Sequence, residues 1–226
     1  MLGQLVGVVG YVALFGTFLF LPARTLRWPA AWILLAVLLI VRSVSAVQLW
    51  RTQRGLMERR TGVPLPQKGQ PAADRILLPL SMASFAALVA FASLDVWQLH
   101  LLPSPPLVVR CAGLLVFAAG WWVAHLALRE NAFALTVVRH QEERDHYVVD
   151  TGPYAIVRHP MYAGVLIVMV GVGLWLGSLA GALATFVPAF IFALRIGVEE
   201  RVLREALPAY SVYAQRVRAR LLPGLW

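Results

Sequence analysis

The chain has 226 residues, of which 60% are hydrophobic and only 14% are charged. This composition excludes a soluble domain and indicates a protein that crosses a membrane several times. The formal net charge of +9 comes almost wholly from arginines that flank apolar segments, so it points to a membrane and not to nucleic acid as partner. A single cysteine excludes an intrachain disulfide.

Six apolar segments follow one another along the chain, and each predicts a helix in the membrane. They cover residues 3–21, 28–50, 76–94, 106–128, 161–176 and 179–197. A helix needs about 20 residues to cross roughly 30 Å of hydrocarbon, so the first four qualify and the last two are shorter. The first has no early positive charge and no cleavage site, which predicts a spanning helix and not a removable signal peptide. The last two, joined by Gly177-Ser178, are predicted to form a helical hairpin, with the fifth crossing partly or at a strong tilt.

The charges between these segments predict the orientation. Arginines gather in segments 51–75 and 129–160 and in the C-terminal tail, whereas the opposite connections carry few. Six crossings bring these three regions and both termini to one face, and the excess of positive charge makes that face cytoplasmic. The prolines and glycines of segment 51–75 predict an irregular loop there. The arginine bias favours a prokaryotic plasma membrane; in a eukaryote the expected membrane is the endoplasmic reticulum.

We therefore expect one all-α domain, a polytopic membrane helical bundle over residues 1–226. It divides into an N-terminal four-helix part, residues 1–128, and a C-terminal part, residues 129–226, that holds most of the polar chemistry.

The stretch of residues 152–164, which we call the polar loop, leads into the fifth segment and includes its first residues. Pro153 and Pro160 restrict the backbone between them, and the stretch contains Arg158, His159 and two tyrosines. Ionisable and aromatic side chains at a water–lipid boundary are suited to chemistry on a membrane substrate. The alternative is that Arg158 and Tyr162 only anchor the helix at the interface.

Charges also enter the last apolar segment. Arg195 and Glu199 are four residues apart on one helix face, and Glu200 and Arg204 repeat this spacing on the next face. Two local ion pairs are the simpler interpretation, while the position at the lipid boundary favours a function. The histidines His140, His146 and His159 lack a metal-ligand spacing, so no metal site is predicted, and neither a phosphate-binding loop nor a Ser or Cys nucleophile is indicated.

Several of these residues together resemble a known family. They are Gly152-Pro153-Tyr154, the run from Arg158 to Gly164, and Glu199-Glu200 with Tyr210 and Tyr213. This combination resembles the isoprenylcysteine carboxyl methyltransferase family, which belongs with the phospholipid methyltransferases among integral-membrane enzymes that use S-adenosylmethionine. The similarity covers about residues 129–223. One departure follows the acidic pair, where Ala206-Leu207-Pro208 replaces the family's usual Phe-Gly.

The resemblance implies a cytoplasmic cofactor pocket, enclosed between the polar loop and the start of the tail. The residues implied to bind S-adenosylmethionine are His146, Tyr147, Val148, Val149, Gly152, Tyr154, His159, Pro160, Met161, Tyr162, Glu199 and Glu200. Arg195 and Glu199 are the implied catalytic residues. Arg195 would orient an acceptor carboxylate or phosphate, and Glu199 would hold the cofactor's amino or ribose groups.

The function expected from this resemblance is methyl transfer to a lipophilic acceptor that enters from the bilayer. A carboxylate acceptor, as in isoprenylcysteine, needs no general base, whereas an amine acceptor must first lose a proton. One alternative is an NADPH-dependent sterol-reductase-like enzyme, although that loop reads His-Pro-Asn-Tyr and this one reads His159-Pro160-Met161-Tyr162. A second alternative is a non-catalytic membrane scaffold or lipid-binding protein. The oligomeric state is not set by the sequence.

Overall fold

A computed structural model describes the chain except for residues 1, 63–66, 68, 140, 142–145 and 225. Within the described ranges the chain is helical and contains no strand, which confirms the all-α prediction. The α-helices are α1 (Leu2–Ala23), α2 (Pro29–Thr52), α3 (Arg54–Gly62), α4 (Ala72–Leu94), α5 (Leu107–Glu130), α6 (Pro160–Leu176), α7 (Leu179–Leu183), α8 (Phe186–Ala206) and α9 (Ala209–Arg216). Among the described residues, short turns of other helix types cover Asp95–Leu99 and Gly152–Ala155.

In the part of the chain that the structure describes, five helical stretches are long and apolar enough to cross a membrane. They are Val6–Ala23, Pro29–Thr52, Ala72–Leu99, Leu107–Glu130 and Leu179–Ala206, and the shorter apolar helix is Pro160–Leu176. A polytopic membrane bundle is therefore confirmed, with the fifth predicted segment short as expected. The prediction that the last segment is also short is wrong, because Leu179–Ala206 extends over 28 residues. Its final turns stay helical because their charged side chains find partners inside the protein, as described below.

The predicted irregular loop at 51–75 is also wrong in part, because α3 forms within it. Arg54 and Glu58 make an ion pair of 2.9 Å one turn apart on this helix. Leu56 is buried against Leu78 of α4 and Val137 from the segment after α5. Burial of Leu56 stabilises this short helix through tertiary packing, and the composition of a loop does not report such a contact.

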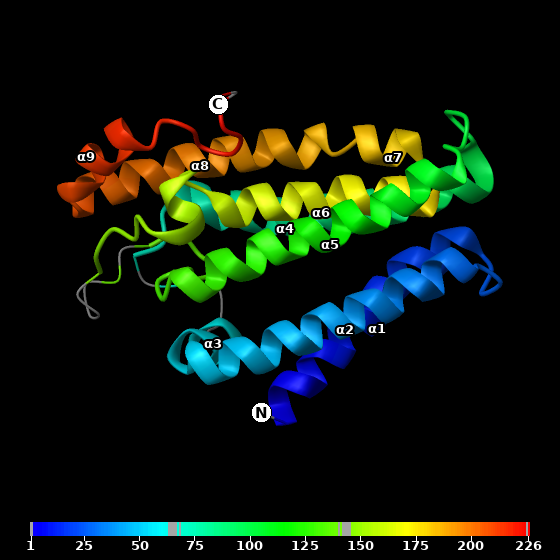
Figure 1. The fold of residues 1–226 in the computed structure, drawn as a ribbon, viewed down its shortest axis with the longest axis horizontal. Coiled ribbons are helices and arrows are strands. Elements are labelled where there is room, and N and C mark those ends of the chain that lie inside the picture. The colour runs from blue at the N-terminus through cyan, green and yellow to red at the C-terminus, as the bar shows by residue number, and fades with distance from the viewer. Residues whose placement is uncertain (1, 63–66, 68, 140, 142–145, 225) are drawn as a thin grey trace.

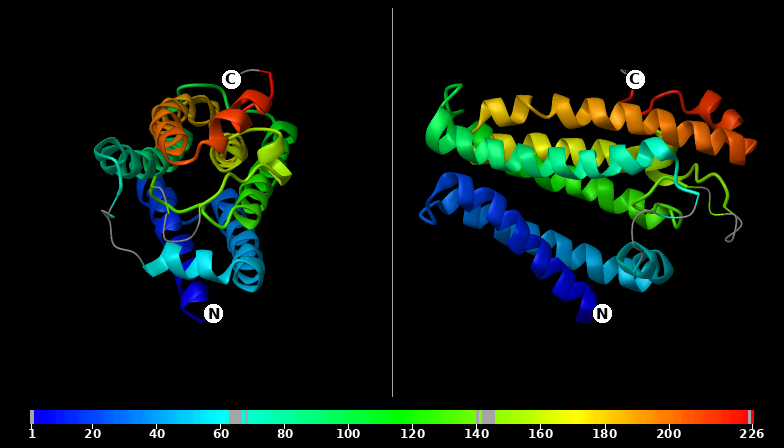
Figure 2. Two further views of the ribbon diagram at one scale, coloured as in Figure 1. Left: turned by 90° about the vertical axis from the view of Figure 1, so that its left-hand side faces the viewer. Right: turned by 180° about the vertical axis from the view of Figure 1, so that it is seen from behind.

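The helices run along one long axis, and their connections separate into two ends (Figure 1). One end holds α9, with α3 nearer to it than to the other end, and we call it the α9 end; the N and C labels lie part-way along the bundle, on opposite sides of it. The turns from α1 to α2, from α4 to α5 and from α6 to α7 lie at the other end. The arginine-rich connections therefore share one end, as the topology prediction requires. Figure 2 shows α1 and α2 together on one side of the bundle.

Close packing between α5 and α6 fixes the start of α6, which carries the polar loop. A Cβ placed on Gly120 would lie 2.6 Å from the backbone nitrogen of Val168, and one on Gly164 would lie 2.7 Å from that of Ala124. Only glycine permits this approach, and small residues are the usual means by which membrane helices come into close contact.

The link between α6 and α8 depends on Gly177 and Ser178. Gly177 ends α6 with φ = 94°, a left-handed conformation that favours glycine. The hydroxyl of Ser178 accepts from the N–H of Gly181 and donates to Asp95 at 2.6 Å. The predicted reversal of direction is present, but α8 packs chiefly along α4 and touches α6 much less. The N-terminal half of the chain, through α4, therefore forms the main packing surface for α8.

Candidate active site

A cavity opens at the α9 end of the bundle, where the spanning helices finish. Its volume is about 90 Å³. Its wall comes from the segment between α5 and α6, from the first turn of α6, from the second half of α8 and from α9. We call residues 131–139, which follow α5 directly, the strap.

Ten of the predicted site residues reach the wall of this cavity. They are His146, Tyr147, Val148, Val149, Tyr154, His159, Met161, Tyr162, Arg195 and Glu199. Among the described residues, the predicted positions that stay out of the wall are Gly152, Pro160 and Glu200. Gly152 has a positive φ of 54° and faces the side chain of Glu130, so its part is in the turn. Pro160 is the first residue of α6.

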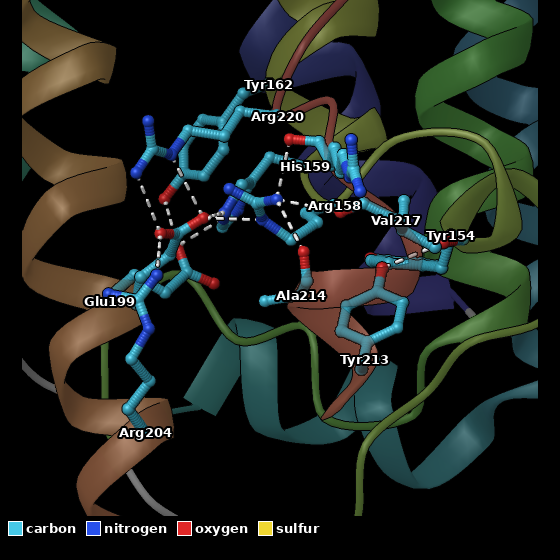
Figure 3. A network of polar contacts seen from close by, with 12 residues as sticks. Tyr154, Arg158, His159, Tyr162, Glu199, Arg204, Tyr213, Ala214, Val217 and Arg220 are labelled. Atoms are coloured by element: carbon cyan, nitrogen blue, oxygen red, sulfur yellow. Dashed lines mark hydrogen bonds and ion pairs between the residues drawn. The ribbon is translucent and has the colours of Figure 1, made fainter. Parts of the chain in front are cut away.

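Glu200 is buried in a cluster of basic side chains, and Figure 3 labels its partners Arg158, His159, Arg204 and Arg220. Arg158 Nε and Arg204 Nη2 each donate to its carboxylate at 2.8 Å, and Arg220 Nε donates at 3.2 Å. His159 Nε2 lies 3.3 Å from the same carboxylate. The predicted pair of Glu200 and Arg204 is thus confirmed. A buried carboxylate requires such partners, because an unpaired charge away from water is costly.

Arg158 is buried inside the protein, so the interpretation that it anchors the helix at the lipid interface is wrong. Its side chain is only 6% exposed. Its Nη1 donates to the carbonyl oxygens of Val217 and Arg218, both at 2.7 Å. The backbone N–H groups of Arg158 and His159 donate to carbonyls of residues 219–220 at 2.9 Å. The polar loop and the C-terminal tail are therefore bound together beside the cavity.

Glu199 faces the cavity, unlike its neighbour. Its side chain is 30% exposed, and one carboxylate oxygen accepts a hydrogen bond of 2.8 Å from the Tyr162 hydroxyl. The Nδ1 atom of His159 lies 4.0 Å from the same oxygen. Tyr162 is held by the ring of Phe192, whose centroid is 5.0 Å away. One acidic oxygen is thereby fixed in position and the side chain remains accessible from the cavity.

Arg195 does not pair with Glu199, so the local ion pair considered from the sequence is wrong. Its Nε donates instead to Asp74 of α4 at 2.8 Å. Its Nη2 donates to the carbonyl of Thr136 in the strap at 2.5 Å. The helix spacing allowed the pair with Glu199, but the packing of α8 on α4 brought a second carboxylate nearer. Arg195 also faces the Tyr162 ring, with 5.7 Å between the guanidinium carbon and the ring centroid.

Two tyrosines of α9, Tyr210 and Tyr213, complete the wall, and the hydroxyl groups of both are neutral at physiological pH. Burial raises the pKa of Tyr213 to about 12, and its hydroxyl donates to the carbonyl of Tyr154 at 2.8 Å. Burial, followed by the nearby charges of Glu200 and Glu199, raises the pKa of Tyr210 as well. The Tyr210 hydroxyl is buried and has no hydrogen-bond partner among the described residues.

Asp74 and the strap are the parts of the site that sequence patterns did not indicate. Asp74 stands at the start of an apolar segment next to Arg75, where it looks like an ordinary polar flank. A lone acid in the first turn of a membrane helix was the available signal. No group of three potential metal ligands occurs in the described part of the chain, and His140 lies outside it.

Comparison with known proteins shows what the chain is similar to. Residues 108–209 match the family described as phospholipid methyltransferase, a match that begins one helix earlier than the sequence resemblance suggested. Protein-S-isoprenylcysteine O-methyltransferase B of Arabidopsis thaliana is 32% identical over 114 residues, 43% of this chain and 58% of the plant protein. A probable protein-S-isoprenylcysteine O-methyltransferase of Oryza sativa subsp. indica is 34% identical over 116 residues, 50% of this chain and 61% of the relative.

A bacterial relative carries a different name. The cobalt-zinc-cadmium resistance protein CzcN of Cupriavidus metallidurans is 38% identical over 80 residues, which make up 34% of this chain and 36% of that protein. Each of these matches spans less than two thirds of the relative. The resemblance drawn from the polar loop and the acidic pair is nevertheless confirmed, because residues 108–209 match the phospholipid methyltransferase family and the two plant relatives carry the isoprenylcysteine methyltransferase name.

Proposed function

We propose that this protein transfers a methyl group from S-adenosylmethionine to a lipophilic acceptor held at the membrane boundary. The observation that carries the proposal is the cavity at the α9 end, whose wall combines Glu199, Tyr162 and Arg195 with the segment 146–149. These residues lie in the stretch that matches the phospholipid methyltransferase family. We also propose that the α9 end faces the cytoplasm, because the arginine-rich connections gather there and the cofactor is water-soluble.

The residues of the cavity fit such a cofactor. Glu199 offers a carboxylate for hydroxyl and amino groups, and Tyr210 offers a buried hydroxyl that has no partner among the described residues. Rings of Phe133, His146 and Tyr147 pack together at the wall, with centroids 4.4 and 4.9 Å from that of Phe133. Flat apolar faces of this kind suit a purine. We therefore assign cofactor binding to these residues together with His159 and Tyr154.

The chain's own contribution is position and charge. When bound, S-adenosylmethionine would supply a methyl group carried by a sulfonium, and the sulfur would keep the electron pair of the broken carbon–sulfur bond as a neutral thioether. The acceptor must lie in line with that bond, and orientation of this kind contributes about 7–11 kcal/mol to lowering a barrier. Arg195 is the residue that orients the acceptor. Two of its nitrogens are already engaged, while Nη1 has no hydrogen-bond partner in the described part of the chain.

This geometry favours an acceptor that carries a carboxylate. A guanidinium held by Asp74 and Thr136 presents its remaining N–H groups in a fixed direction, which suits a planar anion. A carboxylate is ionised at neutral pH and attacks without a base. An amine headgroup must lose a proton first, and Glu199 is the accessible carboxylate of the cavity that could accept it. We propose the carboxylate as the main acceptor and the lipid amine as the second candidate.

Transfer of a radiolabelled methyl group tests the proposal. The purified protein is incubated with methyl-labelled S-adenosylmethionine and either N-acetyl-S-farnesylcysteine or phosphatidylethanolamine in mixed micelles. We expect label in the organic phase that mild alkali releases as methanol, because a methyl ester hydrolyses and an N-methyl group does not. Alkali-stable label would move the assignment to the amine acceptor. No transfer to either acceptor by a folded sample that binds the cofactor would contradict both.

A further inference from the structure

Asp74 joins three separate parts of the chain beside the cavity. It lies in the first turn of α4 and its side chain is completely buried. One carboxylate oxygen accepts from Arg195 Nε at 2.8 Å. The other accepts from Gln70 Nε2 at 2.8 Å and from the backbone N–H of Val138 at 3.0 Å. These hydrogen bonds thus connect Asp74 to α8, to the strap and to the segment just before α4.

Asp74 and Arg195 together attach the strap to the bundle. Arg195 donates to the carbonyl of Thr136, and Asp74 accepts from the N–H of Val138 two residues later. Apolar packing supports the same segment, because Leu135 and Val137 are buried against Leu56 and Leu78. The strap carries Leu135, Val137 and Val138 on the wall of the cavity. Asp74 itself is not part of that wall as described.

We propose that Asp74 is a positioning residue for methyl transfer, which acts by fixing the guanidinium of Arg195 and the strap without contacting either reactant. This inference rests on the proposed function. It also extends the site beyond residues 108–209, the stretch that matches the family, into the N-terminal half of the chain. The long arginine side chain would otherwise hold several rotamers, and two charge-assisted hydrogen bonds select one of them.

A definite rearrangement follows when the charge of Asp74 is removed. Arg195 is then left buried and without its counter-ion, which is unfavourable enough to drive the side chain to another carboxylate. Glu199 stands one turn further along the same helix, a spacing at which an arginine and a glutamate meet. The pair that α4 prevents in the parent protein would then form, and it would engage both residues that the cavity needs.

Asp74→Asn tests this inference, with Asp95→Asn as the matched control. Asp95 is another buried acid of the α4 segment, 2% exposed, but it binds Ser178 and the N–H of Leu101 at the opposite end of the bundle. For Asp74→Asn we expect kcat for the acceptor to fall about 100-fold, the effect of misplacing a reacting group by roughly 1 Å. Cofactor affinity should fall about tenfold, the value of one net hydrogen bond, because Glu199 keeps its charge but is shared with Arg195. Asp95→Asn should leave kcat at the parent value.

A second comparison separates positioning from general stability. In an Arg195→Gln background, Asp74→Asn should change kcat by less than about twofold, since its effect passes through Arg195 and coupled residues are non-additive. The double variant carries no unpaired charge, and in Arg195→Gln alone the Asp74 carboxylate still accepts from Gln70 and from the N–H of Val138, so this comparison does not need Asp74→Asn alone to fold. Equal and additive losses in both backgrounds would overturn the inference, as would a parent-like kcat for Asp74→Asn. A parent protein that neither binds S-adenosylmethionine nor transfers methyl groups would instead remove the proposed function and this inference together.

Discussion

The adjacent acids Glu199 and Glu200 show how one residue's difference in position separates two roles. Glu200 points into a cluster of buried cations, and its carboxylate is 1% exposed. Glu199 points into the cavity, where its side chain is 30% exposed and held by Tyr162. Successive side chains on a helix point about 100° apart, so adjacent residues cannot share these surroundings. We therefore give Glu200 a structural role and propose that Glu199 binds the cofactor.

Glu199→Gln tests the second assignment. The amide keeps the size of the side chain but loses the charge that would bind hydroxyl and amino groups of the cofactor. We expect the Kd for S-adenosylmethionine to rise about 10-fold to 100-fold, the range for one hydrogen bond to a charged group. Glu205→Gln, at an exposed position of the same helix, is the control and should bind as the parent does. Unchanged affinity in Glu199→Gln would remove this residue from the cofactor site.

Glu200→Ala should act on stability in the first place. It leaves Arg158 and its neighbours buried without their carboxylate, which costs about 3–5 kcal/mol for a buried pair. Thermal unfolding in detergent, followed by tryptophan fluorescence, should show a clearly lower Tm than for Glu205→Ala. Equal Tm values for the two variants would mean that the cation cluster does not hold the tail to the polar loop.

The raised pKa of Tyr213 predicts how the free energy of unfolding changes at alkaline pH. A tyrosine in an unfolded chain has a pKa of about 10. Because burial raises the pKa of Tyr213 to about 12 in the folded protein, the unfolded state loses its proton first. The contribution of the neutral hydroxyl is therefore complete below pH 10 and is lost as the pH rises towards 12. Tyr213→Phe should lower the free energy of unfolding by about 1 kcal/mol at pH 8 and show a smaller further loss above pH 10. An alkaline loss as large as the parent's would contradict this account.

Among the helices, the pair α5 and α6 determines where the polar loop lies. Gly120 of α5 approaches the backbone of α6 so closely that an added Cβ would lie 2.6 Å from a nitrogen. Gly120→Ala should therefore separate the two helices and destabilise the protein by about 1–3 kcal/mol, as overpacking does. Gly197→Ala is the control, because its Cβ would meet nothing within 4 Å, and helix propensity predicts a gain of up to about 1 kcal/mol. Thermal unfolding of both variants checks the difference, and equal destabilisation would show that the close approach is not required.

The helices differ in how well the sequence alone predicts them. Spanning helices follow from hydropathy, a local property, so residues 28–50 and 106–128 predict Pro29–Thr52 and Leu107–Glu130 closely. The helix α3 was not predicted, because one buried leucine on a partner surface orders it. The partner of α8 was not predicted either. Chain order suggested α6, whereas packing chose α4, and no local pattern reports that choice.

At the scale of the whole molecule, the N-terminal half packs against the C-terminal half and contributes Asp74, which binds Arg195. The family match covers residues 108–209, and the polar loop and acidic pair that indicated the family lie inside it. Ten of the predicted site residues line one cavity. The resemblance to a family predicted them as a set, whereas hydrophobic periodicity does not predict which polar residues meet in space. Asp74 was missed because its significance depends on a contact with Arg195, 121 residues away in sequence. We infer that an isolated C-terminal part would lack a correctly held Arg195.

Calorimetric titration of the detergent-purified protein with S-adenosylmethionine, S-adenosylhomocysteine and NADPH in parallel tests the central claim most directly. We predict saturable binding of the first two, which share the adenosyl and amino acid groups that the cavity would hold, and no binding of NADPH. Binding of NADPH alone would contradict the claim and favour a reductase. Silence from all three ligands on a folded sample would contradict it as well and would leave a non-catalytic, lipid-binding protein.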